Sequence, residues 1–438
     1  MYRSRRIARR LVFCTGLIFS VSSAYALKFE PGIGVGLEYT DNAALTEENQ
    51  LDDLIAVGYI GAILEDDEGP LVADITASLN HHRYTKDTFE DQRYFNLGAT
   101  AGWDMIRNRF KWFLSNYFLQ RSIDSIEPNT PDNIQDSNSF TFGADIAVPL
   151  SARQMFTLRP EYLNFYYEIQ TTDNQQYSLS ASWNYQLNAL TSVGLNGSVR
   201  TIDYDEPLVD DVSFSSVFFA ISTVRARSDF STNLGSTRVD RDNGQNTDEF
   251  AGNLDWLLEL TQRSRFRAFI STDLTDSSSG ALNATVDPGT GDPNDIQIGT
   301  DVIRSKVLTL EYAREDGTLK SSLTGQLREL DYSESPDDRR IRSLNAVFNY
   351  PMTGLLTSGF YARYRHTEYI DLVRTDNDYT VGGNLKYRMS RKLTSSFDVK
   401  YRNRDSTLEM QSYDEWSAYI SLVYGFGQPL RPTRSGGF

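Results

Sequence analysis

The side chains best suited to catalysis are scarce in this sequence. Three histidines occur, His81, His82 and His366, and the one cysteine is Cys14. A histidine supports hydrolysis only when a nucleophile or a carboxylate converges on it, and neither a G-x-S-x-G nor an H-E-x-x-H spacing is present. All three histidines fall toward the ends of predicted strands, where a rim position explains them without chemistry. We therefore predict that the protein is not an enzyme.

An oxygen-rich stretch, residues 287–295 with the sequence DPGTGDPND, is the second candidate for a site. Carboxylate and carbonyl oxygens are the ligands that Ca²⁺ prefers, but this spacing does not match an EF-hand loop. A solvated surface loop is the simpler interpretation. We predict no metal site and no cofactor, and calcium binding by this loop stays open as an alternative.

Basic residues at two-residue spacing are the third candidate. Within a strand such residues lie on one face, as Lys386 and Arg388 would. Arginine grips carboxylates and phosphates with paired N–H groups, and a basic wall attracts anionic solutes. In the alternative interpretation, the charges pair with acids on neighbouring strands and only solvate the wall. The basic residues predicted to line one lumen are Arg265, Arg267, Lys320, Arg328, Arg363, Arg365, Lys386, Arg388, Lys400 and Arg402.

These side chains can share a lumen only if the strands that carry them close into a barrel. Residues 416–426 read WSAYISLVYGF. Trp416, Ile420 and Tyr424 belong to an apolar stripe on one face, whereas Ser417 and Ser421 lie on the other. An apolar outer face that ends in aromatics, with a polar inner face, is typical of outer-membrane barrels. Such a strand must close onto the first strand, because an open edge in hydrocarbon leaves backbone groups unpaired.

Segments with this alternation recur from Phe29 to the end of the chain. Short turns such as 66–69 and 390–392 alternate with longer polar connections such as 41–52 and 277–301. We predict an all-β fold: a transmembrane antiparallel up-and-down β-barrel of about 20 strands (about 18–22), with short periplasmic turns, longer extracellular loops and both termini in the periplasm. The soluble alternatives, a propeller or a sandwich, do not require lipid-facing stripes. The longest loop, 277–301, is the best candidate to fold into the lumen.

The first 26 residues have the features of a secretory signal peptide. Five arginines precede an apolar run at residues 11–21, and Ala24-Tyr25-Ala26 is an A-x-A cleavage site. Removal of this segment takes away the one cysteine and leaves 38 basic against 59 acidic residues, a net charge of −21. That charge argues against nucleic acid as a partner. The expected parts are a signal peptide at 1–26, an outer-membrane β-barrel at 27–426 and a C-terminal tail at 427–438.

A short motif connects these strands to a known family. Residues 38–42 read EYTDN at the end of a first strand in which every second residue is glycine, and Leu45 follows. With the repeated strands behind it, the chain resembles the porin-like outer-membrane β-barrel proteins found with exopolysaccharide and exosortase (PEP-CTERM) systems. The resemblance covers nearly the whole mature chain. It implies an integral barrel in the outer membrane of a Gram-negative bacterium, without supplying known functional residues.

These features lead to one functional hypothesis and several alternatives. The resemblance implies a channel or an accessory in exopolysaccharide export, with an anionic polysaccharide as a partner. A general diffusion porin is the alternative, followed by a surface enzyme or a structural adhesin. The other expected partners are outer-membrane lipid, lipopolysaccharide and the barrel assembly machinery.

Overall fold

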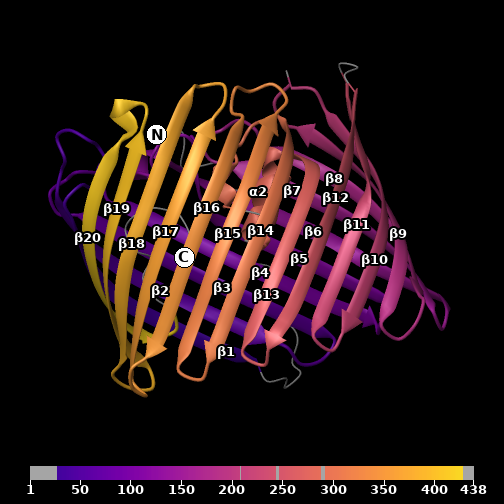
Figure 1. Ribbon diagram of the computed structural model, residues 1–438, viewed down its shortest axis with the longest axis horizontal. Coiled ribbons are helices and arrows are strands. Elements are labelled where there is room, and N and C mark those ends of the chain that lie inside the picture. The colour runs from indigo at the N-terminus through magenta and orange to yellow at the C-terminus, as the bar shows by residue number, and fades with distance from the viewer. Residues whose placement is uncertain (1–26, 208, 243–245, 288–291, 428–438) are drawn as a thin grey trace.

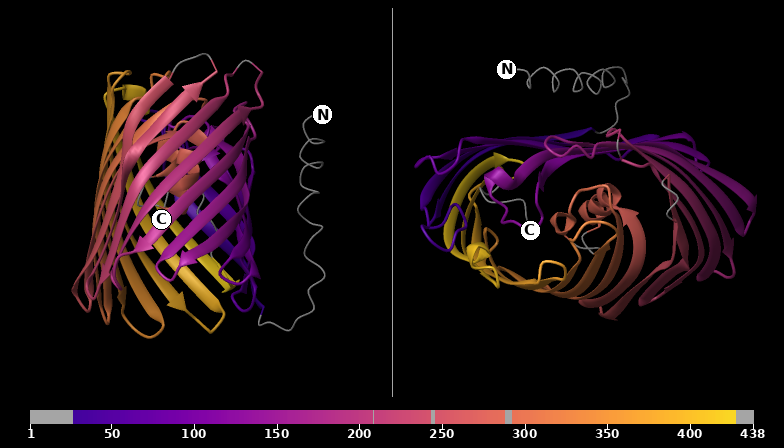
Figure 2. Two further views of the ribbon diagram at one scale, coloured as in Figure 1. Left: turned by 90° about the vertical axis from the view of Figure 1, so that its right-hand side faces the viewer. Right: turned by 90° about the horizontal axis from the view of Figure 1, so that it is seen from above.

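A computed structural model describes residues 27–207, 209–242, 246–287 and 292–427. Within them the chain forms a single antiparallel sheet of 20 strands, and β1 (Lys28–Thr40) pairs with β20 (Tyr413–Gly425), so the sheet closes. Figure 1 shows this barrel from the side, and Figure 2 shows its oval outline from above. The predicted antiparallel β-barrel of about 20 strands is confirmed. The expected signal peptide, residues 1–26, and the tail beyond residue 427 lie outside the described residues.

The strands have 13 to 18 residues each, which exceeds the roughly 9–11 residues that cross a bilayer at a tilt. Each strand pairs with the one before and the one after it. The remaining strands are β2 (Asp53–Asp66), β3 (Leu71–Tyr84), β4 (Gln92–Ile106), β5 (Phe110–Ser122), β6 (Ile134–Ser151), β7 (Gln154–Tyr167), β8 (Asn174–Gln186), β9 (Thr191–Tyr204), β10 (Val212–Arg225), β11 (Ser228–Arg241), β12 (Asn246–Thr261), β13 (Ser264–Asp276), β14 (Val302–Asp316), β15 (Leu319–Tyr332), β16 (Arg339–Pro351), β17 (Leu356–Tyr369), β18 (Arg374–Arg388) and β19 (Leu393–Ser406).

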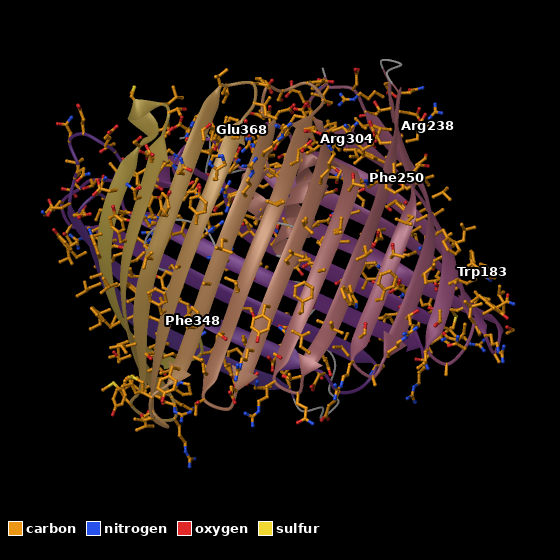
Figure 3. All side chains as sticks on the ribbon, viewed as in Figure 1. Trp183, Arg238, Phe250, Arg304, Phe348 and Glu368 are labelled. Atoms are coloured by element: carbon orange, nitrogen blue, oxygen red, sulfur yellow. The ribbon has the colours of Figure 1, made fainter. Side chains whose placement is uncertain are left out.

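The closing strand β20 shows how side chains divide between the two faces of the wall. Trp416, Ile420 and Tyr424 are all more than half exposed on the outside. Large apolar side chains are exposed at alternate positions on the other strands too, and Figure 3 labels Phe250 and Phe348 among them. An exposed apolar belt of this extent would be unstable in water, so it identifies the surface that contacts lipid. Among the described residues, no helix is long and apolar enough to cross a membrane.

The part of the wall where β1 pairs with β20 is called the seam below. Its inner face is packed with side chains rather than open to the lumen. Tyr419 and Val423 of β20 are buried, and so are Ile55, Val57 and Tyr59 on neighbouring β2. The alternation in the sequence separated the two faces correctly, but it could not show that this part of the wall is filled by side chains.

The EYTDN motif of the sequence fastens the seam at one end. The Asp41 carboxylate accepts a hydrogen bond from the backbone N–H of Trp416 at 2.8 Å. The Asn42 amide donates to the carbonyl oxygens of Thr46 and Asp414 at 2.7 and 2.8 Å. Because the bonds to Trp416 and Asp414 connect the first hairpin to the last strand, the motif stabilises barrel closure at the point where β1 ends.

Candidate functional site: a segment inside the barrel

The connection between β13 and β14, residues 277–301, is called the inner segment below, and its described residues, 277–287 and 292–301, lie inside the barrel. Its described parts contain the helix α2 (Ser277–Val286) and the 3-10 turn η4 (Pro293–Asp295). Figure 2 shows α2 within the ring of strands when the barrel is seen from above. The loop singled out by its length therefore does fold into the lumen.

The hairpin of β13 and β14 carries the inner segment away from the wall. Pairing between β12 and β13 reaches only as far as Gly252 and Thr272, whereas β13 and β14 stay paired up to Asp276 and Val302. Beyond Thr272, Leu274 is buried in an apolar cluster with side chains of β9, β10 and β11. The end of the hairpin therefore crosses β12 on its lumenal side and packs on the inner faces of β9, β10 and β11.

The start of α2 is bound to one side of the barrel. The Asp276 carboxylate caps the helix by accepting a hydrogen bond from the Ser279 N–H at 2.9 Å. Arg200 of β9 contacts Asp276 at 3.0 Å and donates to the Ser279 hydroxyl at 2.8 Å. Tyr167 of β7 and the Ser278 hydroxyl are 3.0 Å apart. The serines of this helix therefore bond to the wall, which explains why a helix of low intrinsic propensity forms here.

An apolar cluster fixes the middle of the inner segment to the strands on which it lies. Ala281, Ile296 and Ile298 come from the segment itself, and all three are at most 5% exposed. Burial of apolar side chains on this scale is the main stabilising term for a packed loop. The side chains of the wall that complete the cluster are Phe165, Tyr167, Ile303, Leu330 and Tyr332.

The end of the inner segment is bound to the other side of the barrel by ion pairs. The Asp295 carboxylate contacts Arg365 of β17 at 2.5 Å and Arg328 of β15 at 3.4 Å. Arg363 lies 3.7 Å from the Asp292 carboxylate. Burial opposes the charge of Asp295, but Arg365, Arg328 and Arg363 outweigh this effect and hold the pKa of its carboxyl below the usual range.

A second connection, residues 123–133 between β5 and β6, braces the inner segment. The Gln297 side-chain oxygen accepts hydrogen bonds from the N–H and the hydroxyl of Ser125 at 2.8 and 2.9 Å. Arg339 of β16 donates to the same Ser125 hydroxyl at 3.0 Å, and Arg374 of β18 donates to the Ile126 carbonyl at 3.2 Å. Two connections therefore reach strands on the far side of the barrel, and the arrangement can narrow a passage.

Most of the basic residues predicted to line the lumen have an acidic neighbour. Arg267 and Asp255 are 2.8 Å apart, and Arg402 and Glu415 are 2.6 Å apart. The same holds for Arg265 with Glu311, Lys320 with Glu315, Arg328 and Arg365 with Asp295, and Arg363 with Asp292.

The other three predicted residues are Lys386, Arg388 and Lys400. Arg388 donates to the Gly354 carbonyl at 2.8 Å. Lys386 is exposed and Lys400 is buried. In the register of β18 and β19, Lys386 lies opposite Ser396 and Lys400 lies opposite Gly382, so the two lysines are at different heights.

Asp276 and Arg339 of this site were not predicted from the sequence, and Asp292 and Asp295 were considered only as part of the oxygen-rich stretch, not as partners of arginines. The signal for α2 was the N-cap residue Asp276 ahead of three serines, but serine and glycine also suit a loop. The ion pairs of Asp295 had no local signal, because its partners Arg328 and Arg365 are 33 and 70 positions away.

The three histidines lie on β3 and β17, and His81 is 3.9 Å from the Asp91 carboxylate. His82 is buried with its ring edge-on to Tyr94 at 5.0 Å, and His366 lies 2.9 Å from the Asn377 side-chain oxygen. No group of three or more histidine, cysteine or acidic side chains suited to a metal occurs in the part of the chain that the structure covers. Residues 288–291 of the oxygen-rich stretch lie outside it.

Comparison with known proteins gives one match to a sequence family. Residues 341–426, which contain β16 to β20, match the family described as "Putative beta-barrel porin 2". No curated protein matches the chain.

The solved structures with a similar arrangement of strands share little sequence with this chain. The FrpB iron transporter from Neisseria meningitidis is 8% identical over 91% of this chain and 82% of its own, with a TM-score of 0.49. The siderophore receptor PirA from Pseudomonas aeruginosa is 12% identical over 92% and 81%, with a TM-score of 0.48. OccK2 (OpdF) from Pseudomonas aeruginosa, solved in complex with glucuronate, is 9% identical over 92% and 99%, with a TM-score of 0.40.

Proposed function

We propose that this porin-like outer-membrane β-barrel is a diffusion channel whose passage is narrowed by the inner segment. The observation that carries the proposal is the attachment of that segment to both sides of the barrel, through Arg200 at one end and Arg365 at the other. A barrel of about 16–18 strands already encloses an aqueous channel, so a 20-stranded one has room for a segment and a passage beside it.

Single-channel recording in a planar bilayer tests this function. The mature protein should give steady current steps. A variant in which residues 279–299 are replaced by a short Gly–Ser turn should give larger steps, because the segment no longer occupies the lumen. Absence of current from both proteins would contradict the channel, and equal step sizes would contradict the narrowing role of the segment.

A role in exopolysaccharide export is the second candidate function, and the EYTDN resemblance favours it. The lumenal charges give a further reason. Lys386 and Arg388 lie toward the turn end of β18, while Lys400 and Arg402 lie opposite residues nearer its other end. Lys400 is thus about 13 Å from Lys386 along the strand direction, four residues of strand rise. Basic residues spread along the pore suit a charged polymer, which can pass from one to the next.

Export of a polysaccharide would require a different state of the barrel from diffusion of small solutes. A chain of linked sugars needs a continuous passage, so the inner segment would have to be displaced during export. Replacement of the four basic residues by glutamine should weaken current block by alginate, an acidic polysaccharide, and shift ion selectivity toward cations. Unchanged block and unchanged selectivity would leave the diffusion channel as the supported function.

The proposed orientation places the short turns and both termini in the periplasm and the inner segment's end of the barrel outside. Support comes from the outer surface beyond the apolar belt, where Lys306 pairs with Glu329 at 2.8 Å and Arg340 lies 3.7 Å from Glu329. These charges face away from the lumen and would lie among lipopolysaccharide head groups. Lipid and lipopolysaccharide are the partners this surface favours.

A further inference from the structure

The inner wall formed by β8, β9 and β10 carries no charge over most of its height. On β8 the outward positions are held by Tyr177, Leu179 and Trp183, so Ser178, Ser180 and Ser182 face inward. Below Arg200, the inward positions of β9, and those of β10 as far as Ser222, are likewise serine, asparagine, glycine, alanine or phenylalanine. By contrast, the inward face of β17 to β19 carries Arg363, Arg365, Asp378, Lys400 and Arg402.

A pocket of ≈ 310 Å³ lies on this uncharged wall. Ser180, Ser182, Asn196 and Ser198 contribute polar groups, and Phe218 contributes an aromatic ring. The volume is at the lower end of the range of small-molecule sites, about 300–1,000 Å³. Register places the pocket just below the inner segment, because Arg200, which bonds to α2, is two residues above Ser198, and Ser198 lies opposite Ser180.

The hydroxyls of the pocket are available to a solute. Within the described residues, Ser180, Ser182 and Ser198 form no side-chain hydrogen bond with the protein. Each hydroxyl can donate one hydrogen bond and accept two. Neighbouring hydroxyls on adjacent strands, such as Ser180 opposite Ser198, therefore offer both kinds of partner about 5 Å apart.

One edge of the pocket is charged, but its charges are already compensated. Arg159 makes two hydrogen bonds to Asp145, at 2.6 and 2.9 Å, and its guanidinium lies 4.9 Å from the ring centre of Phe113. Glu161 lies 4.0 Å from the same guanidinium. An anionic ligand at this edge would meet two carboxylates, and a cationic ligand would meet Arg159. The edge therefore favours a polar ligand without net charge.

We infer that this pocket is a binding site for a neutral saccharide on its way through the channel. A sugar presents hydroxyls that both donate and accept, which match the serines, and an apolar C–H face, which packs on an aromatic ring such as Phe218. The inference deepens the proposed function and rests on it, since it names the class of solute that the channel carries. It also separates the path of neutral sugars from the charged wall on β17 to β19.

Binding and conduction are measured separately so that the two proposals can fail independently. Saturation-transfer NMR on the mature protein in detergent reports maltotriose binding, and single-channel recording reports current block by the same sugar. The acidic trisaccharide trigalacturonate is the charged comparison. The test variant is Ser180→Val/Ser198→Val. The control is Ser322→Val/Ser343→Val, which removes two inward-facing, half-buried serines on β15 and β16.

The wild-type protein and the control should bind maltotriose equally and more tightly than trigalacturonate. The Ser180→Val/Ser198→Val variant should raise the half-blocking concentration about tenfold or more, because two hydrogen-bond partners are lost. A second variant, Arg159→Gln, should not improve trigalacturonate binding, because the carboxylates of Asp145 and Glu161 remain at the edge of the pocket. Equal maltotriose binding by test and control variants, or tighter binding of trigalacturonate than of maltotriose to wild type, would overturn the site. Maltotriose binding without any current would overturn the channel and leave the site.

Discussion

The ion pair between Asp295 and Arg365 gives the sharpest test of the inner segment. The Asp295 side chain is 5% exposed and contacts two arginines, of which Arg328 is 2% exposed. Removing one partner from a buried ion pair costs about 3–5 kcal/mol, because the other charge stays buried. Asp295→Asn keeps the size of the side chain and one hydrogen-bond acceptor, so the lower value of about 3 kcal/mol applies. At about 1.4 kcal/mol per factor of ten, the ratio of detached to attached segment should rise about 100-fold.

Single-channel recording at pH 7 measures that ratio as the frequency of high-conductance events. The matched control is Asp255→Asn, which removes a lumenal carboxylate 2.8 Å from Arg267 where both side chains are about one-third exposed. Such a pair contributes about 1 kcal/mol or less, so its loss should change the event frequency only a few-fold. The same small change in both variants would refute the reasoning, because the contact of Asp295 would then not hold the segment.

The direction of the Asp295 pKa shift determines how the contact between Asp295 and Arg365 depends on pH. The pKa of the Asp295 carboxyl is lowered in the folded protein. The ion pair therefore stabilises the attached segment fully above the usual aspartate pKa of about 3.9, and this stabilisation is lost as the pH falls through the lower folded value. High-conductance events should therefore stay rare from pH 8 down to about pH 4 and increase only in stronger acid. An increase near pH 6 would show that another group controls the segment.

Three further predictions concern the wall, the seam and the orientation. Ile420→Arg places a charge on the lipid face midway between Trp416 and Tyr424 and should lower the free energy of folding into liposomes by about 2–4 kcal/mol, whereas Ser343→Arg on the inner face should cost less. Asn42→Ala removes one hydrogen bond to Asp414 across the seam and one to Thr46 within the loop, and it should destabilise the barrel by about 1–3 kcal/mol in urea titrations in lipid; an unchanged midpoint would mean that the motif does not stabilise closure. A protease site inserted after Leu372 should be cut on intact cells, and one inserted after Gly317 only once the outer membrane is opened; the reverse pattern would invert the proposed orientation.

The sequence alone was sufficient to predict the wall of the barrel. Side-chain direction alternates in every strand, so the apolar stripe of β20 and the alternation of short and long connections could be read without knowing which strands pair. Closure followed from the same reasoning, since an open edge in lipid is too costly. The number of strands, about 20, followed from counting the alternating segments, and length made residues 277–301 the best candidate to enter the lumen.

The tertiary structure decided what the inward-facing charges do. Whether Arg365 faces a solute or a carboxylate depends on Asp295, which is 70 positions away and reaches it only because β13 leaves the wall after Thr272. The packed seam and the uncharged wall of β8 to β10 likewise depend on which strands become neighbours and how the oval barrel brings their inner faces together. Alternation is a local property of one strand, whereas pairing of charges and filling of a lumen are properties of the closed barrel, and no single strand contains that information.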